Sequence, residues 1–166
     1  MMSNQATDFL KKIALKEKFD TYDCLSGEIE FSDSADTIGA NTNIYLSSGS
    51  VYCFIAIKAD NSDIEALFEE TGNTVNEIQK NSGQYLIYCG KDINPGSRIA
   101  AHVRPRTNTG NAELEKISAL RNFQIIYGSV YVQNYLNFEQ LVHKKHPPLI
   151  GSPRPGKKSK YTFIEK

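Results

Sequence analysis

Apolar and polar positions repeat with two different periods along this chain, and these periods predict its secondary structure. Three runs rich in β-branched and aromatic residues predict strands. They are residues 50–58 (SVYCFIAIK), 84–89 (QYLIYC) and 123–132 (FQIIYGSVYV), and the segment 28–31 (EIEF) indicates at most a further short strand.

Apolar residues at helical spacing predict two helices in the first half of the chain. Residues 7–19 place Phe9, Leu10, Ile13 and Leu15 on one face, with lysines between them. Residues 61–83 form a longer pattern. We expect it to begin at a Ser62–Glu65 capping box, to end at Gly83 and to be open to a break at Gly72.

The second half of the chain predicts three more helices. A turn at 90–96 leads into a short helix that carries Arg98 and His102 and ends near Pro105. Residues 111–121 form the next helix, with Asn111 as its cap, and residues 137–146 form the last, with an Asn137–Gln140 capping box and Pro147 as its stop. The pattern as a whole predicts a single α/β domain in which about three strands are covered by helices.

Composition supports an ordinary folded domain of 166 residues. We expect a cytoplasmic protein, since no apolar run reaches the roughly 18 residues of a membrane span and the N-terminus lacks a signal-peptide core. The cysteines, Cys24, Cys53 and Cys89, are widely spaced. Reduced thiols are expected, rather than disulfides or a metal site.

Charge is distributed unevenly although the net charge is zero. Residues 1–97 carry 7 Lys and Arg against 15 Asp and Glu, a net −8, whereas residues 98–166 carry 12 against 4, a net +8. Such polarity predicts a basic face for a polyanion. Alternatively, the fold interleaves the two halves and the charges cancel.

Several side chains are candidates for phosphate chemistry. Arg98 and His102 lie four residues apart, so on a helix both would project from one face as phosphate donors. Tyr88 ends a predicted strand, and Gly90 permits a close approach of ligand to backbone. Glu139 borders an apolar helix face and could hold Mg²⁺ against a phosphate. Its alternative is a surface salt bridge with a lysine.

Together these residues resemble the motifs of the GIY-YIG nuclease superfamily, in the same order along the chain. Residues 49–52 (GSVY) are similar to the GIY motif, with Tyr52 as its tyrosine, and residues 88–91 (YCGK) are similar to YIGK. Arg98 and His102 match the R-x-x-x-H spacing. Residues 139–148 (EQLVHKKHPP) resemble the segment that begins with the metal-binding glutamate.

The resemblance implies a small central antiparallel sheet and a Mg²⁺-dependent endonuclease for double-stranded DNA, with Mn²⁺ as an alternative metal. Tyr52 would orient or deprotonate water, supported by Tyr88, although a phenol with a pKa of about 10 needs assistance. Arg98 would neutralise the phosphate and Glu139 would hold the metal. The resemblance also implies that His102 would hydrogen-bond a tyrosine or the scissile oxygen. Gly90 and Lys91, in the segment similar to YIGK, are expected to bind substrate. Arg104 and Arg106 lie in the polar loop 103–111 and are candidates for contacts with DNA bases, with a solvated loop as the alternative.

Three departures from the family pattern narrow this prediction. Ser50 precedes the valine-tyrosine pair where the family has glycine, Gly151 stands in place of a usual asparagine, and a helical insertion separates the two tyrosine motifs. The insertion favours a restriction-type enzyme. A homodimer is expected because a single site of this kind cuts one strand. The alternatives are a phage or homing nuclease, a repair-type nicking enzyme, a nuclease toxin and a catalytically silent nucleic-acid-binding module.

The sequence predicts three parts of the chain. Residues 1–48 would be an N-terminal helix and extension that serves as a DNA-recognition or dimer arm. Residues 49–151 would be the nuclease domain. Residues 152–166 would be a basic tail.

Overall fold

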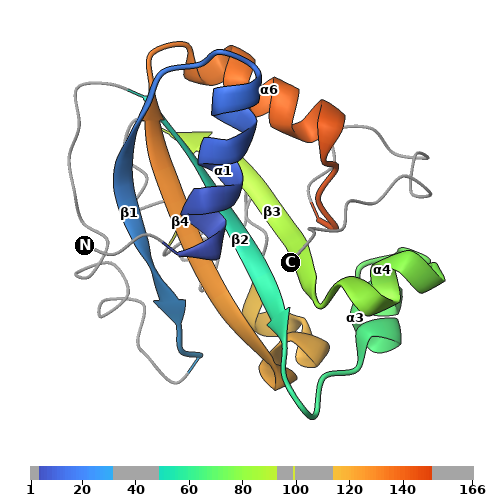
Figure 1. The fold of residues 1–166 in the computed structure, drawn as a ribbon. Helices are drawn as coiled ribbons and strands as arrows, with labels where there is room; N and C mark the ends of the chain where they lie inside the picture. The colour runs from blue at the N-terminus through green and yellow to red at the C-terminus, as the bar shows by residue number, and fades with distance from the viewer. Residues whose placement is uncertain (1–3, 32–48, 93–98, 100–113, 151–166) are drawn as a thin grey trace.

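A four-stranded antiparallel sheet lies at the centre of the protein (Figure 1). The structure is a computed structural model and describes residues 4–31, 49–92, 99 and 114–150. The strands lie in the order β1-β4-β2-β3. This confirms the α/β class with a small antiparallel sheet. The strands are β1 (Thr21–Ile29), β2 (Ser50–Lys58), β3 (Gln84–Asp92) and β4 (Phe123–Val132).

Helices cover both faces of the sheet. One face carries α1 (Gln5–Lys16), which lies in front of the sheet in Figure 1, and α6 (Tyr135–Lys145), which crosses one end of it. We call this the α6 face. The opposite face, here the α3 face, carries α3 (Ile64–Glu70) and two short 3-10 helices. The remaining elements are α4 (Glu77–Ser82), η1 (Leu114–Lys116) and η2 (Ser118–Asn122).

The central strand β2 separates two hydrophobic cores. Val51, Cys53 and Ile55 belong to the core on the α6 face, whereas Tyr52 and Phe54 belong to the core on the α3 face. Successive side chains of a strand point to opposite faces, so a strand covered on both sides is apolar without interruption. This explains why the sequence predicts β2 so clearly.

The strand predictions are correct for the interior of the sheet and wrong at its edges. The bounds of β2 and β4 are confirmed, whereas β3 continues through Asp92, so Gly90 lies within a strand and not in a turn. β1 spans nine residues, of which the predicted 28–31 strand includes only the last two. β1 is an edge strand with several exposed side chains, so its apolar alternation is weak.

The first predicted helices are confirmed as helices, but their caps differ. The side chain of Asn4 caps α1, and Leu15 is 83 % exposed instead of lying on the buried face. The segment 61–83 divides into α3 and α4 around Gly72, whose φ of 76° lies in the left-handed region. Asp63 caps α3 in place of the predicted Ser62, and Gly83 ends α4 as expected.

The later helices differ more from prediction. The described part of segment 111–121 forms the 3-10 helices η1 and η2, and Asn111 lies outside the described residues. The last helix begins at Tyr135, so Asn137 lies inside it and the predicted capping box does not form. It ends before Pro147, as expected.

Two further expectations concern cysteines and membranes. All three cysteines are free, with Cys53 and Cys89 buried and Cys24 half-buried. Within the part of the chain that the structure describes, no helix has both the length and the apolar character needed to span a bilayer. The predicted N-terminal part contributes β1 to the sheet and α1 to the layer that packs on it. The predicted tail 152–166 lies outside the described residues.

Candidate active site

A β-bulge in β3 places both motif tyrosines on one face of the sheet. Tyr52 pairs with Gly90 and Phe54 pairs with Tyr88, but the next pair joins Ile55 to Leu86, which leaves one extra residue on β3. A bulge of this kind resets the alternation of side chains. Tyr88 therefore packs on the α3 face with Tyr52, instead of pointing to the α6 face.

The ring of Tyr52 lies over Gly90. A Cβ added to Gly90 would lie 2.5 Å from the Tyr52 hydroxyl oxygen and 3.0 Å from Cε1 of Tyr88. Only glycine leaves room for the two rings, which stack at a centroid distance of 6.3 Å. Tyr52 is 1 % exposed and Tyr88 is half-buried, so Tyr88 is the more accessible phenol. These contacts explain why a glycine at position 90 accompanies Tyr52 and Tyr88.

Glu139 lies beside the next residue of β3. One carboxylate oxygen is 3.3 Å from Nζ of Lys91, and the other is 3.1 Å from Nε2 of His143. The Glu139 side chain is 14 % exposed, against 42 % for Lys91. Burial raises the pKa of the Cys89 thiol, and the charges of Cys53 and Glu139 raise it further. The surface salt bridge with a lysine, which was the alternative role for Glu139, is present.

His143 is a site residue that the sequence motifs did not indicate. Its Nε2 lies 2.8 Å from the carbonyl oxygen of Cys89 as well as 3.1 Å from Glu139. Both partners are acceptors, so Nε2 carries the hydrogen. Nδ1 is buried and has no hydrogen-bond partner among the described residues. The signal in the sequence was the i, i+4 spacing of Glu139 and His143, which places both on one helix face.

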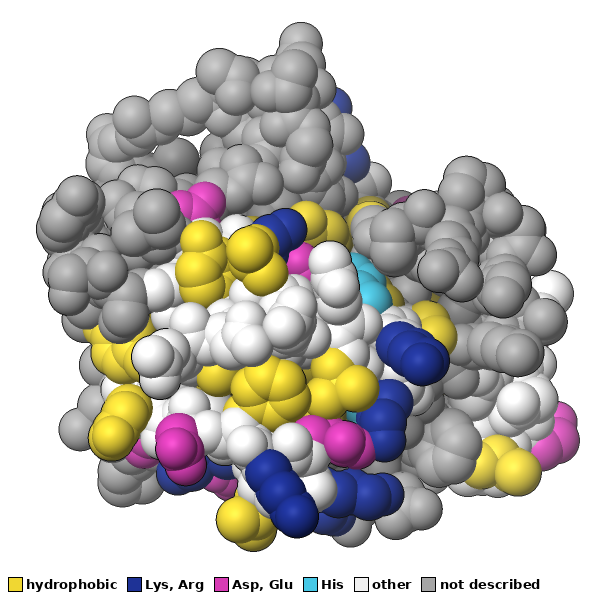
Figure 2. All heavy atoms as spheres, turned by 90° about the horizontal axis from the view of Figure 1, so that it is seen from above, with side chains coloured by type: hydrophobic (Ala, Val, Ile, Leu, Met, Phe, Trp, Pro, Cys, Tyr) yellow, Lys and Arg dark blue, Asp and Glu magenta, His cyan; other side chains and the backbone are white. Residues whose placement is uncertain are grey.

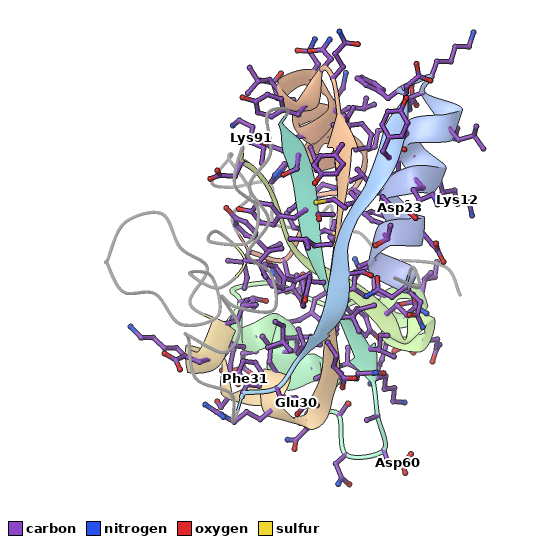
Figure 3. All side chains as sticks on the ribbon, turned by 90° about the vertical axis from the view of Figure 1, so that its left-hand side faces the viewer. Lys12, Asp23, Glu30, Phe31, Asp60 and Lys91 are labelled. Carbon is purple, nitrogen blue, oxygen red and sulfur yellow. The ribbon has the colours of Figure 1, made fainter. Side chains whose placement is uncertain are left out.

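The structure divides the predicted site residues between two faces of the sheet. Tyr52, Tyr88 and Gly90 form one group on the α3 face. Lys91 pairs with Val51 and so lies with Glu139 and His143 on the α6 face. The two groups meet at the end of β3, where Gly90 and Lys91 are consecutive and the strand is the edge of the sheet. Figure 3 shows Lys91 at this end of the molecule.

Four predicted site residues lie outside the described residues. They are Arg98, His102, Arg104 and Arg106, and Gly151, at the position of the family asparagine, is also outside them. Ile99 is described and is fully buried in the core on the α3 face. The helix predicted for Arg98 and His102 therefore stays a prediction.

Glu139 would be the protein ligand of a metal ion at this site. Among the residues that the structure describes, no three His, Cys, Asp or Glu side chains are grouped closely enough to hold a metal ion. Mg²⁺, however, keeps several water ligands and often takes only one or two carboxylates from the protein. The partly buried carboxylate of Glu139 fits such a hydrated ion, provided that Lys91 moves aside.

A hollow at the other end of the sheet is not part of this site. It has a volume of about 440 Å³. Figure 3 shows Asp60, one of its lining residues, far from Lys91 along the sheet. Its other lining residues are Ala59, Asn61, Arg121, Asn122, Phe123 and Gln124.

Comparison of this chain with models of protein families, with curated proteins and with solved structures finds no match.

Proposed function

We propose that this protein is a Mg²⁺-dependent endonuclease that hydrolyses phosphodiester bonds in double-stranded DNA. The observation that carries the proposal is the β3 bulge, which stacks Tyr88 beside Tyr52 over the bare backbone of Gly90. Without the bulge, the second motif tyrosine would point to the opposite face. The two phenols on the α3 face, and the carboxylate, lysine and histidine on the α6 face at the same end of β3, are groups that phosphodiester hydrolysis can use.

The tyrosines would act on the attacking side of the phosphate. Tyr88 is half-buried, so its hydroxyl would donate to a non-bridging phosphate oxygen. Tyr52 is held over Gly90 and is almost without solvent contact, so it would orient the attacking water in a site closed by substrate. The phosphate would bind at the end of β3, because the exposed Lys91 on the α6 face directly follows Gly90, which packs under the tyrosines on the α3 face.

Glu139 and its neighbours would act on the leaving side. Glu139 would hold Mg²⁺, which supplies positive charge to the leaving oxygen. His143 would fix the carboxylate by donating from Nε2, and Lys91 would move from the carboxylate to the phosphate. As the resemblance implies, Arg98 would neutralise the phosphate and His102 would hydrogen-bond a tyrosine or the scissile oxygen. Arg104 and Arg106 would contact the DNA bases.

A restriction-type homodimer is the setting that we propose for this activity, since one such site cuts one strand. A silent nucleic-acid-binding module is the second candidate, and a specific observation favours it. Lys91 already neutralises Glu139, and no metal-binding group of three side chains occurs among the described residues. In that case the tyrosines and Glu139 would be structural.

Plasmid cleavage tests the proposal. The parent protein is incubated with supercoiled DNA in Mg²⁺, in Mn²⁺ and in EDTA, beside Glu139→Gln and Tyr88→Phe. We expect cleavage with metal, none with EDTA, and a loss of about 100-fold or more in each variant. Gln140→Ala, an exposed neighbour on α6, is the matched control and should cut like the parent.

The outcomes separate the two candidates. Discrete fragments indicate a restriction-type enzyme, while nicked circles or smears indicate a repair-type enzyme or a toxin. Intact DNA that is nonetheless retarded in a gel establishes the binding module. Cleavage by Glu139→Gln at the parent's rate would refute the role of Glu139.

A further inference from the structure

The C-terminal end of α6 packs against α1, and four exposed lysines lie on these two helices. The edge of the Phe9 ring packs against His146 with a centroid distance of 5.2 Å, and Lys145 bonds to Glu17. These contacts join the C-terminal end of α6 to the first half of α1 and to its C-cap, Glu17. Figure 2 looks down on this end of the molecule and shows Lys and Arg side chains close together on one side of it. The lysine surface consists of Lys12, Lys16, Lys144 and Lys145, all exposed.

The acidic groups that the structure describes neutralise only a small part of this charge. Lys145 is paired with Glu17. Within the described parts of the chain, no carboxylate forms an ion pair with Lys12, Lys16 or Lys144. Both Lys16 and Lys145 contribute to the lowered pKa of His146, after the larger effect of burial. Lys16 of α1 and Lys145 of α6 therefore both lie near His146.

Helix dipoles explain only part of this arrangement. Lysines in the last turn of a helix interact favourably with its carbonyl end, which accounts for Lys16, Lys144 and Lys145. Lys12 lies one turn earlier on α1 and projects away from the sheet (Figure 3). It shares a helix face with Lys16 through the i, i+4 spacing, although like charges at that spacing repel. An anionic partner would remove this repulsion.

The position of the lysine surface relative to Glu139 identifies the partner. Lys144 and Lys145 follow Glu139 by five and six residues on α6, which is about 8 Å along the helix axis and more than about 100° around it. One DNA strand carries a charge every 3.4 Å or so along its axis, so this separation spans roughly two phosphates. We propose that the lysine surface binds the phosphate backbone of DNA two to three nucleotides from the bond held at Glu139. This inference rests on the proposed nuclease function.

An anionic membrane is the competing partner, because Leu15 is 83 % exposed between Lys12 and Lys16. A membrane-binding helix, however, needs a broad apolar face directed outward. The apolar face of α1 is buried against the sheet through Phe9, Leu10 and Ile13. The geometry therefore favours nucleic acid.

The test measures binding apart from cleavage. The full chain is titrated onto a fluorescent 30-base-pair duplex in EDTA, at several salt concentrations. The triple variant Lys12→Gln/Lys16→Gln/Lys144→Gln keeps Lys145, whose pairing with Glu17 joins the helices. We expect its affinity at 100 mM salt to fall at least tenfold. The salt slope should decrease by about 0.9 for each phosphate that a lysine no longer neutralises.

A charge-matched control removes three lysines elsewhere: Lys58→Gln/Lys80→Gln/Lys116→Gln, at solvent-accessible positions outside the lysine surface. It should retain the parent's affinity within about twofold, and circular dichroism establishes that both variants are folded. An equal loss of affinity in both triples would refute the inference, because only net charge would then matter. Binding to phosphatidylserine vesicles without binding to the duplex would also refute it.

The lysine surface and the proposed hydrolysis can fail separately. If the lysine triple loses affinity but the parent never cleaves plasmid, the lysine surface stands and the nuclease function fails. If the parent cleaves and the lysine triple binds as the parent does, the nuclease function stands and the lysine surface fails.

Discussion

Nε2 of His143 lies close to the carboxylate of Glu139 and donates a hydrogen bond to the carbonyl oxygen of Cys89. The two distances are 3.1 and 2.8 Å, and the His143 side chain is 9 % exposed. The histidine thereby ties the candidate metal-binding carboxylate on α6 to the strand that carries Tyr88 and Gly90. It links the segment that begins at Glu139 to the backbone of the second tyrosine motif.

Replacing His143 should lower the affinity for Mg²⁺ more than it lowers the stability of the fold. We expect His143→Gln to raise the Mg²⁺ concentration for half-maximal cleavage by about 10- to 100-fold, because partners that orient a ligand commonly contribute that much to metal affinity. Saturating Mg²⁺ should restore most of the rate. Rates measured across a Mg²⁺ titration test this, with Gln140→Ala as the control. An unchanged Mg²⁺ dependence would show that His143 is only a packing residue.

Adding a single methyl group at Gly90 should destabilise the fold. In Gly90→Ala the new Cβ would meet the Tyr52 hydroxyl oxygen at 2.5 Å and its Cζ at 2.7 Å, so the ring must shift. We expect a loss of about 1 to 3 kcal/mol in the free energy of unfolding, measured in urea. The loss of unfolding free energy caused by Gly90→Ala should be smaller by about 0.5 kcal/mol or more in a Tyr52→Phe background, because that background lacks the hydroxyl oxygen nearest to the new Cβ. Equal costs in the two backgrounds would contradict the contact.

The sequence predicts the centre of this sheet well because burial on both faces dictates its composition. β2 and β4 are almost wholly buried, and their predicted bounds are those observed. β1 escaped prediction because its register against β4 and the side chain of Ser129 stabilise it, and both come from residues about a hundred positions away. The local pattern of apolar residues does not reflect contacts with residues so distant in the sequence.

The sequence motifs indicated some residues of the candidate site, without His143, but they did not predict its arrangement. Tyr52, Gly90 and Tyr88 share a face only because β3 has a bulge, which the sequence does not mark. The position of Glu139 on the α6 face depends on which face α6 covers, and that choice is made by the packing of Phe138 and Val142. Spacing along the chain determines neither.

Ser129 should contribute to stability through its hydroxyl. Its Oγ accepts from the Leu25 amide at 2.9 Å and donates to the Leu25 carbonyl at 3.2 Å, at the point where the β1–β4 register shifts. Both hydrogen bonds are buried. Ser129→Ala leaves the two backbone groups without this partner, so we expect about 1 to 3 kcal/mol of destabilisation in urea unfolding. Gln124→Ala, exposed on the same strand, should change stability by less than about 0.5 kcal/mol.

His146 should make the fold less stable in mild acid. Burial, followed by the charges of Lys145 and Lys16, lowers its pKa below the usual 6.5. The unfolded chain therefore binds the proton more readily than the folded chain, and stability falls as the pH decreases through the unfolded pKa. Above about pH 7 both states are neutral at this residue, so no such loss occurs there.

A comparison of the parent with His146→Gln isolates this effect. We expect the urea concentration at the unfolding midpoint of the parent to decrease when the pH is lowered from 7.5 to 5. The midpoint of the variant should decrease by a smaller amount. The variant should also be less stable at pH 7.5, because it loses the packing of His146 against Phe9. Parallel pH profiles for the two proteins would show that the proton affinity of His146 is the same in the folded and unfolded states. Such a result would contradict the burial of its ring between α1 and α6.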